Sequence, residues 1–201
     1  MVPIVACLAL AAAEPDMKQS YRGFYIPAEA MLPTLLVDDR ILADMRDRRA
    51  GRGDIVLLKQ PDGIYIKRVV AVAGDTVAIR GGLPVINGRP VRQVPDGTLA
   101  VNVNGLKLAQ VFRETLPGEH GSHRVLDVGT TPQDNTERQI VPPGHVFVLG
   151  DNRDNSEDSR FPVEVGGVGM LAVAAIRGRP LFFYWSHDRK KIGKVPEGGG
   201  R

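Results

Sequence analysis

The sequence lacks several features that would place it in common classes of protein. Its 201 residues include a single cysteine, Cys7, which excludes an internal disulfide and any multi-cysteine metal site. No uncharged apolar run reaches the roughly 18 to 20 residues that a bilayer-spanning helix needs. The 26 basic and 23 acidic residues leave a net charge of only +3. Basic residues are scattered among acidic ones, so we do not expect a nucleic-acid-binding protein.

Histidine is also scarce, with four residues in the chain. The spacing of His120, His123 and His145 does not match that of a metal-binding cluster, and we interpret them as loop or surface residues. We therefore expect no metal site, and we expect no cofactor.

Glycine and proline, by contrast, are plentiful. The 23 glycines and 15 prolines separate many short apolar runs, a pattern that favours strands and turns over long helices. Asp62-Gly63 and Asn87-Gly88 are two-residue hairpin signals. The sequence predicts a mainly β protein with strands at 24–26, 40–43, 54–59, 64–72, 75–80, 145–149, 168–176 and 181–185.

A short loop between the first two predicted strands is the most unusual stretch. The segment from Ile26 to Leu36 has no helical or strand period, and Pro27 and Pro33 each fix φ and remove a hydrogen-bond donor. We expect a rigid, irregular loop. Met31 and Leu32 are apolar where turn residues are usually polar, and positions 28 and 30 are alanines.

The strand predicted at 64–72 carries one conspicuous charge. Alternation places Tyr65, Lys67, Val69 and Ala71 on one face, where the lysine is the only charged side chain. Such a lysine must pair, reach water or lose its proton. Arg68 points to the opposite face and is expected to pair with a carboxylate, with Asp151 as a candidate.

The segment from Gly150 to Arg160 reads Gly-Asp-Asn-Arg-Asp-Asn-Ser-Glu-Asp-Ser-Arg. Aspartate, asparagine and serine side chains bond to nearby backbone groups and stabilise irregular turns. Most of these residues are therefore expected to have a structural role.

These three blocks, in this order, resemble the type I signal peptidase family of Ser/Lys peptidases. The family's loop reads Ser-x-Ser-Met-x-Pro-Thr-Leu, and its second serine attacks the scissile carbonyl. In this chain that position is Ala30, and the position of the first serine, which supplies an oxyanion donor, is Ala28. The resemblance implies a signal peptidase/LexA-like core of antiparallel β-sheet with a β-rich insertion.

The same resemblance implies roles for other residues. Lys67 would be the general base and Ser156 would orient it. Asp158 and Arg160 would form a supporting ion pair, beside the pair of Arg68 and Asp151. The shallow pockets for small residues before the cut would be walled by Ile26, Pro27, Met31, Leu35, Tyr65 and Ile66.

The expected organisation follows the blocks. The peptidase-like core comprises residues 21–83 and 141–186, and the β-rich insertion comprises residues 84–140. Residues 187–201 are expected to be a basic, flexible tail. The aromatic run at 181–185 has two interpretations, as part of the core or as part of an apolar edge that faces a membrane.

Residues 1–20 form an apolar N-terminal segment. The uncharged run at 1–13 fits a signal-peptide apolar region without its basic start, or the end of a longer membrane anchor, which we favour, or an apolar end packed on the body. The resemblance places the protein at the cytoplasmic (inner) membrane, with its domain on the periplasmic side.

Alanine cannot act as the nucleophile, so whether this chain is an enzyme is open. The leading hypothesis is an impaired signal peptidase that keeps its groove and binds precursors with small residues before the cut, with an active peptidase as a further candidate partner. The alternatives are an active signal peptidase represented by an inactivated sequence and a non-enzymatic adaptor at the membrane surface. A self-cleaving regulator of the LexA type would need a DNA-binding module, for which residues before 21 leave no room.

Overall fold

The structure, a computed structural model, describes residues 20–102 and 105–198 and consists of antiparallel strands joined by turns. The predicted mainly β fold is confirmed. The largest sheet contains seven strands in the order β1-β2-β14-β3-β4-β12-β13. Its strands are β1 (Tyr21–Tyr25), β2 (Arg40–Asp44), β3 (Ile55–Gln60), β4 (Gly63–Val72), β12 (His145–Leu149), β13 (Leu171–Ala172) and β14 (Ile176–Trp185).

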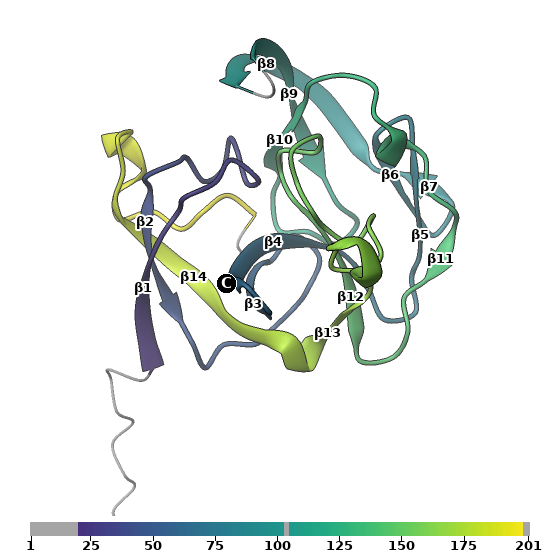
Figure 1. The fold of residues 1–201 in the computed structure, drawn as a ribbon, viewed down its shortest axis with the longest axis horizontal. Coiled ribbons are helices and arrows are strands. Elements are labelled where there is room, and N and C mark those ends of the chain that lie inside the picture. The colour runs from purple at the N-terminus through teal and green to yellow at the C-terminus, as the bar shows by residue number, and fades with distance from the viewer. Residues whose placement is uncertain (1–19, 103–104, 199–201) are drawn as a thin grey trace, which may run out of the picture.

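The remaining strands form two smaller sheets, which lie to the other side of β4 from β1 and β2 (Figure 1). One sheet has the order β10-β9-β8 and the other β11-β5-β6-β7. Their bounds are β5 (Thr76–Arg80), β6 (Leu83–Ile86), β7 (Arg89–Pro90), β8 (Arg92–Asn102), β9 (Leu106–Thr115), β10 (His123–Asp127) and β11 (Gln139–Ile140). Short 3-10 turns are η1 (Pro132–Asp134), η2 (Val163–Val165), η3 (Val173–Ala175) and η4 (Arg189–Lys191).

The four-stranded sheet shares a hydrophobic core with the large sheet, and the three-stranded sheet is buried in a separate cluster with Leu32. Val70 on β4 and Phe147 on β12 are buried in one cluster with Ile79 on β5 and Ile86 on β6. Burial of this shared apolar surface holds the two parts together. The region expected as an insertion is thus β-rich, and it packs directly on the core strands rather than forming a separate lobe.

Strand β4 is the strand on which the site is built. It pairs with β3 along Gly63 to Arg68, and with β12 only from Arg68 onward. At Gly150 the chain leaves the sheet. Within the described residues, the edge of β4 from Gly63 to Lys67 therefore has no neighbouring strand on that side.

The C-terminal strands differ from the prediction. Two strands were expected at 168–176 and 181–185. Instead a single strand, β14, begins at Ile176 and runs through the expected turn, and before it only Leu171–Ala172 is a strand. Register shifts let β14 pair first with β3 and then with β2. A Cβ added to Gly178 would lie 2.6 Å from the carbonyl oxygen of Asp44, so glycine permits this close approach.

Residues 187–198 are not the flexible tail that was expected. Gly193 donates its N–H to the carbonyl of Phe183 at 2.8 Å, and Phe183 donates to the carbonyl of Lys194 at 3.0 Å. Lys191 forms an ion pair with the buried carboxylate of Asp39 at 2.7 Å. The composition suggested disorder because it contains no sign of these distant backbone partners. Residues 199–201 lie outside the described part.

The expectations for the N-terminal segment fall on residues 1–19, which lie outside the described residues. Over residues 20–102 and 105–198, no helix is long and apolar enough to cross a membrane.

A buried ion pair joins β4 to the segment after β12. The guanidinium of Arg68 donates to both carboxylate oxygens of Asp151, at 2.7 and 2.6 Å, and both side chains are 1% exposed. Burial alone raises the pKa of Asp151, but the Arg68 charge outweighs it and lowers that pKa overall. The pairing of Arg68 with Asp151 that the sequence suggested is present.

His123 lies close to this pair and is buried, so its interpretation as a surface or loop histidine was wrong. Its Nδ1 lies 2.7 Å from Glu119 Oε1 and its Nε2 lies 3.3 Å from Glu114 Oε1. Glu114 also accepts a hydrogen bond from Arg153 at 2.6 Å. Burial lowers the pKa of His123, but its contacts with the carboxylates of Glu114 and Glu119 help to raise that pKa overall.

We expect Asp151→Asn to lower the free energy of unfolding by about 3 to 5 kcal/mol, because it leaves the buried Arg68 charge without a counter-charge. The measurement is urea denaturation followed by circular dichroism. Asp96→Asn is the matched control, because Asp96 pairs with Arg113 at the surface, and it should cost less than about 1 kcal/mol. Equal effects of the two substitutions would contradict the structural importance of the buried pair.

Candidate active site

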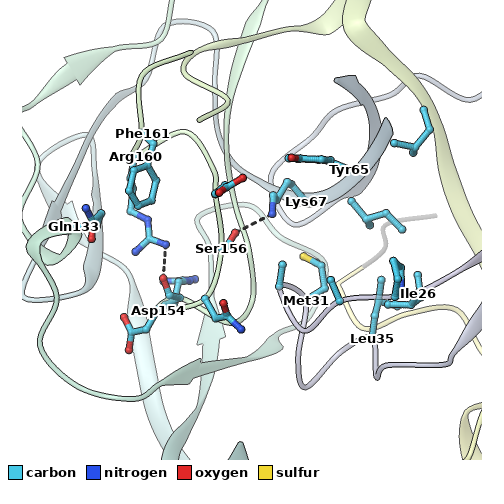
Figure 2. A pocket seen from close by; sticks show the side chains of 18 of the residues that line it. Ile26, Met31, Leu35, Tyr65, Lys67, Gln133, Asp154, Ser156, Arg160 and Phe161 are labelled. Atoms are coloured by element: carbon cyan, nitrogen blue, oxygen red, sulfur yellow. Dashed lines mark hydrogen bonds between the residues drawn. The ribbon is translucent and has the colours of Figure 1, made fainter. Parts of the chain in front are cut away.

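A groove of about 530 Å³ runs along the free edge of β4. Its walls come from residues 26–36, here called the proline loop, and from β4, the segment after β12 and η1. Figure 2 shows Lys67 and Ser156 near its middle, with Ile26, Met31 and Leu35 to one side. The structure brings together all ten residues that the sequence assigned to catalytic or substrate-binding positions: Ile26, Pro27, Ala28, Ala30, Met31, Leu35, Tyr65, Ile66, Lys67 and Ser156.

Lys67 is held at the centre of this groove by β4. Its side chain is directed toward the segment after β12, and its Nζ donates a hydrogen bond to Ser156 Oγ at 2.9 Å (Figure 2). The lysine is only 3% exposed, whereas Ser156 is half-buried. No salt bridge to Lys67 is present within the described residues, so a serine hydroxyl is the principal polar partner of its amine.

Burial lowers the pKa of Lys67 below the ordinary value for lysine. The carboxylates of Asp158 and Glu157 act in the opposite direction, since negative charge stabilises the ammonium, but they do not outweigh the burial. The neutral amine therefore forms at lower pH than in an exposed lysine. A neutral amine can accept a proton, which is what a general base requires.

The proline loop is fixed by backbone bonds and by its buried apolar side chains. Ile26 and Asp39 are joined at its base, where the N–H of Ile26 donates to the carbonyl of Asp39 at 2.9 Å. The N–H of Leu35 donates to the carbonyl of Met31 at 2.9 Å, and both side chains are buried. These bonds and buried side chains fix the conformation of the loop. Ala30 is half-buried and lines the groove.

Gly150 lets the loop approach the segment that carries Ser156. A Cβ added at Gly150 would lie 2.2 Å from Ser156 Oγ and 2.5 Å from the carbonyl oxygen of Ala30. Any larger residue would push these two groups apart. The N–H of Asn152 also donates to that carbonyl of Ala30, at 3.1 Å. Position 30 and Ser156 therefore both lie against Gly150, and Ser156 is the residue that bonds the Lys67 amine.

The loop that carries Ser156 is stabilised by Asp158. One oxygen of this buried carboxylate accepts a hydrogen bond from Gly150 N–H at 3.1 Å, and the other accepts from Arg160 Nε at 2.9 Å. Arg160 also donates to the carbonyl of Arg153. The ion pair expected between Asp158 and Arg160 is present, and it connects the two ends of the loop around Ser156.

Sequence reasoning missed part of the groove wall. Thr131 and Gln133, at η1, line the groove together with Phe161, and none of the three was among the predicted site residues. A four-residue polar turn has no hydrophobic period that would reveal its tertiary position. The one available signal was Thr131-Pro132-Gln133-Asp134, which has the form of a capping box and so predicts a fixed turn.

The described residues contain no group of histidine, cysteine and acidic side chains arranged to hold a metal ion. What the groove does contain is a buried amine beside a serine hydroxyl, next to an unpaired strand edge. This arrangement suits proton transfer at a bound polypeptide. At position 30 the groove is lined by a methyl group, which has no lone pair with which to attack a carbonyl.

Comparison with known proteins agrees with this geometry. Residues 2–185 match the family model described as signal peptidase, peptidase S26. The chain is 31% identical to signal peptidase I of Pseudomonas fluorescens, over 86% of this chain and 68% of that protein. It is 30% identical to signal peptidase I S of Bacillus subtilis, over 85% of this chain and 80% of that protein.

Other similarities cover less of this chain. Signal peptidase I of Rickettsia prowazekii is 36% identical over 56% of this chain, which spans only 46% of that protein's length. A crystal structure of a signal peptidase I from Enterococcus faecalis matches 65% of this chain and 96% of its own, with 23% identity and a TM-score of 0.36.

The lowered pKa of Lys67 predicts a pH dependence of stability. Between that pKa and the unfolded value of about 10.5, the unfolded chain binds more protons than the folded chain, so stability rises with pH in this window. Lys67→Met removes the titrating group. We expect the parent to gain stability relative to this variant as the pH rises toward 10.5, measured by urea denaturation at a series of pH values.

Lys107→Met, at an exposed position on β9, is the control for loss of one amine. A stability difference between the parent and Lys67→Met that stays constant from neutral pH to pH 10 would contradict the lowered pKa.

Proposed function

Because the chain belongs to the signal peptidase family, peptidase S26, we propose that it binds the signal-peptide region of exported preproteins in its groove and has little or no peptidase activity of its own. One observation carries this proposal. The buried amine of Lys67 lies in the wall of the groove and donates a hydrogen bond to Ser156. Position 30, in the same wall, has only a methyl group as its side chain.

The apolar part of the groove supports binding of extended peptide. Ile26, Met31 and Leu35 are buried and form the floor of the apolar part, so the space above them stays open. Tyr65 and Ile66 are half-buried along the edge of β4. A shallow channel of this kind accepts small side chains at positions before a cut. The free edge of β4 can pair with an extended backbone.

The chemistry of a complete site shows what the alanine changes. A serine hydroxyl at position 30 would give its proton to neutral Lys67 and attack the scissile carbonyl, and Lys67 would return that proton to the leaving amine. Ser156 would keep the lysine oriented throughout. A second hydroxyl at position 28 would donate a hydrogen bond to the developing oxyanion.

Alanine at position 30 removes the first step. Loss of a serine peptidase nucleophile lowers kcat on the order of 10⁶-fold, or about 8 kcal/mol of barrier. Thr34 cannot substitute for it, because that side chain is buried and its hydroxyl accepts a hydrogen bond from Arg68 Nη2 at 3.4 Å. Lys67 and Ser156 then act on the bound peptide only as hydrogen-bonding groups.

Family membership supports a location at the cytoplasmic membrane, with the groove on its outer side. The aromatic run at 181–185 is mixed, because Phe183 is buried while Phe182, Tyr184 and Trp185 are each more than a third exposed. Tyr25 on β1 is exposed as well. Exposed aromatic residues suit a membrane–water interface. An active peptidase that receives the bound precursor remains a proposed partner.

Restoring the hydroxyl tests the proposed loss of activity. We expect Ala30→Ser, and more strongly the double variant with Ala28→Ser, to cleave a purified preprotein, while the parent chain does not. The expected gain approaches the roughly 10⁶-fold effect of a missing nucleophile. The measurement is the rate of appearance of the mature protein on gels, with mass spectrometry of the cut site.

Ala30→Ser combined with Lys67→Met is the control, and it should be inactive because the general base is gone. Cleavage by the parent at a rate within about tenfold of the restored chain would refute the proposed inactivity. Binding is tested separately, by titrating the parent with a synthetic signal peptide. Absence of binding at millimolar peptide would refute the proposed role of the groove.

A further inference from the structure

The groove has two halves of different chemistry, which meet at Lys67 and Ser156. One half is apolar and contains the residues proposed to wall the pockets for small side chains. The other half is polar, and Figure 2 shows Gln133, Asp154 and Arg160 on the far side of Ser156 from Met31 and Leu35. Nothing in the proposed function so far assigns a role to this polar half.

Most polar groups in this half already have partners. The Arg160 guanidinium is paired with Asp158, and the carboxylate of Asp154 accepts hydrogen bonds from the N–H groups of Val128 and Gly129. Gln133 is different. Its amide makes no hydrogen bond to any of the described residues, although the side chain is half-buried in the groove wall.

Gln133 is also held firmly in place. It lies in η1 between Thr131 and Asp134, whose side chains and backbone groups are joined at 2.8 and 3.0 Å. Asp134 is buried, and its carbonyl accepts a hydrogen bond from Gly82 N–H at 3.0 Å. The turn is thereby tied to the loop between β5 and β6, so the backbone that carries Gln133 is already ordered before a ligand binds.

The direction of a bound peptide follows from the positions of the two halves. If the residues before the cut occupy the apolar half and the scissile carbonyl lies at position 30, the chain must continue past Ser156 into the polar half. An extended backbone there presents both N–H and C=O groups. A glutamine amide can accept from the first and donate to the second.

We propose that Gln133 binds the backbone of the residues that follow the cut, so that the polar half of the groove recognises the start of the mature protein. The proposal rests on the proposed function, because it requires that precursor peptides lie in the groove. It adds a contact on the mature side of the cut, contributed by η1, and it makes recognition depend on more than the signal peptide alone.

The test uses two synthetic peptides and isothermal titration calorimetry with the intact parent chain. The short peptide ends at the residue before the cut, and the long peptide continues for four residues beyond it. We expect Gln133→Ala to weaken binding of the long peptide about 3- to 10-fold, the effect of losing about one hydrogen bond, and to leave binding of the short peptide unchanged.

Gln139→Ala, on the exposed strand β11 and outside the groove lining, is the matched control and should alter neither affinity. Equal weakening of both peptides by Gln133→Ala would mean that the residue only supports the fold, and it would overturn the proposal. So would unchanged affinity for the long peptide. If the parent binds neither peptide, the proposed function itself fails, and this inference fails with it.

Discussion

The site depends on the buried ion pair between Arg68 and Asp151. Arg68 follows Lys67 on β4, so the two side chains leave the strand in opposite directions, and Asp151 lies five residues before Ser156. Fixing Arg68 to Asp151 therefore fixes the strand that carries the amine relative to the loop that carries its hydroxyl partner. The two oxygen contacts at 2.7 and 2.6 Å set orientation as well as distance. The contacts of Asp158 with Gly150 and Arg160 stabilise the Ser156 loop internally, and the pair of Arg68 with Asp151 joins that loop directly to β4.

The lowered pKa of Lys67 depends on the pairing of nearby carboxylates with arginines. Asp151 is neutralised by Arg68 and Asp158 by Arg160, so neither carboxylate forms a direct ion pair with the amine. Had either one been free to approach Lys67, it would have stabilised the ammonium and kept the pKa high. Pairing each acid with an arginine leaves burial as the dominant influence on the lysine. The same arginines thus serve both the geometry of the site and its basicity.

Short sequence patterns predicted the turns and strands that neighbouring residues determine. Asn87-Gly88 forms a tight turn between β6 and β7 with φ of 51° and 76°, as the sequence indicated, because only such residues adopt these angles readily. The alternation around Lys67 likewise predicted the strand, whereas its role as a buried general base was expected only from the family resemblance. The errors concern tertiary partners. The bulged strand β14 requires the contact of Gly178 with Asp44, and the ordering of residues 187–198 requires Phe183 and Asp39. These partners are far away in sequence, and composition contains no information about them.

A buried lysine without a nucleophile to deprotonate has an energetic consequence. Removing an ammonium from water disfavours the folded state, and in an active enzyme that cost accompanies catalysis. Here the methyl group of Ala30 has no proton to give to the lysine, so stability alone does not explain an amine at position 67. In the proposed function the amine still has a use, because it can donate a hydrogen bond to the carbonyl of a peptide lying across Ser156. The groove then holds a peptide by contacts that a working peptidase would use to cleave it, and the lysine contributes to binding rather than to turnover.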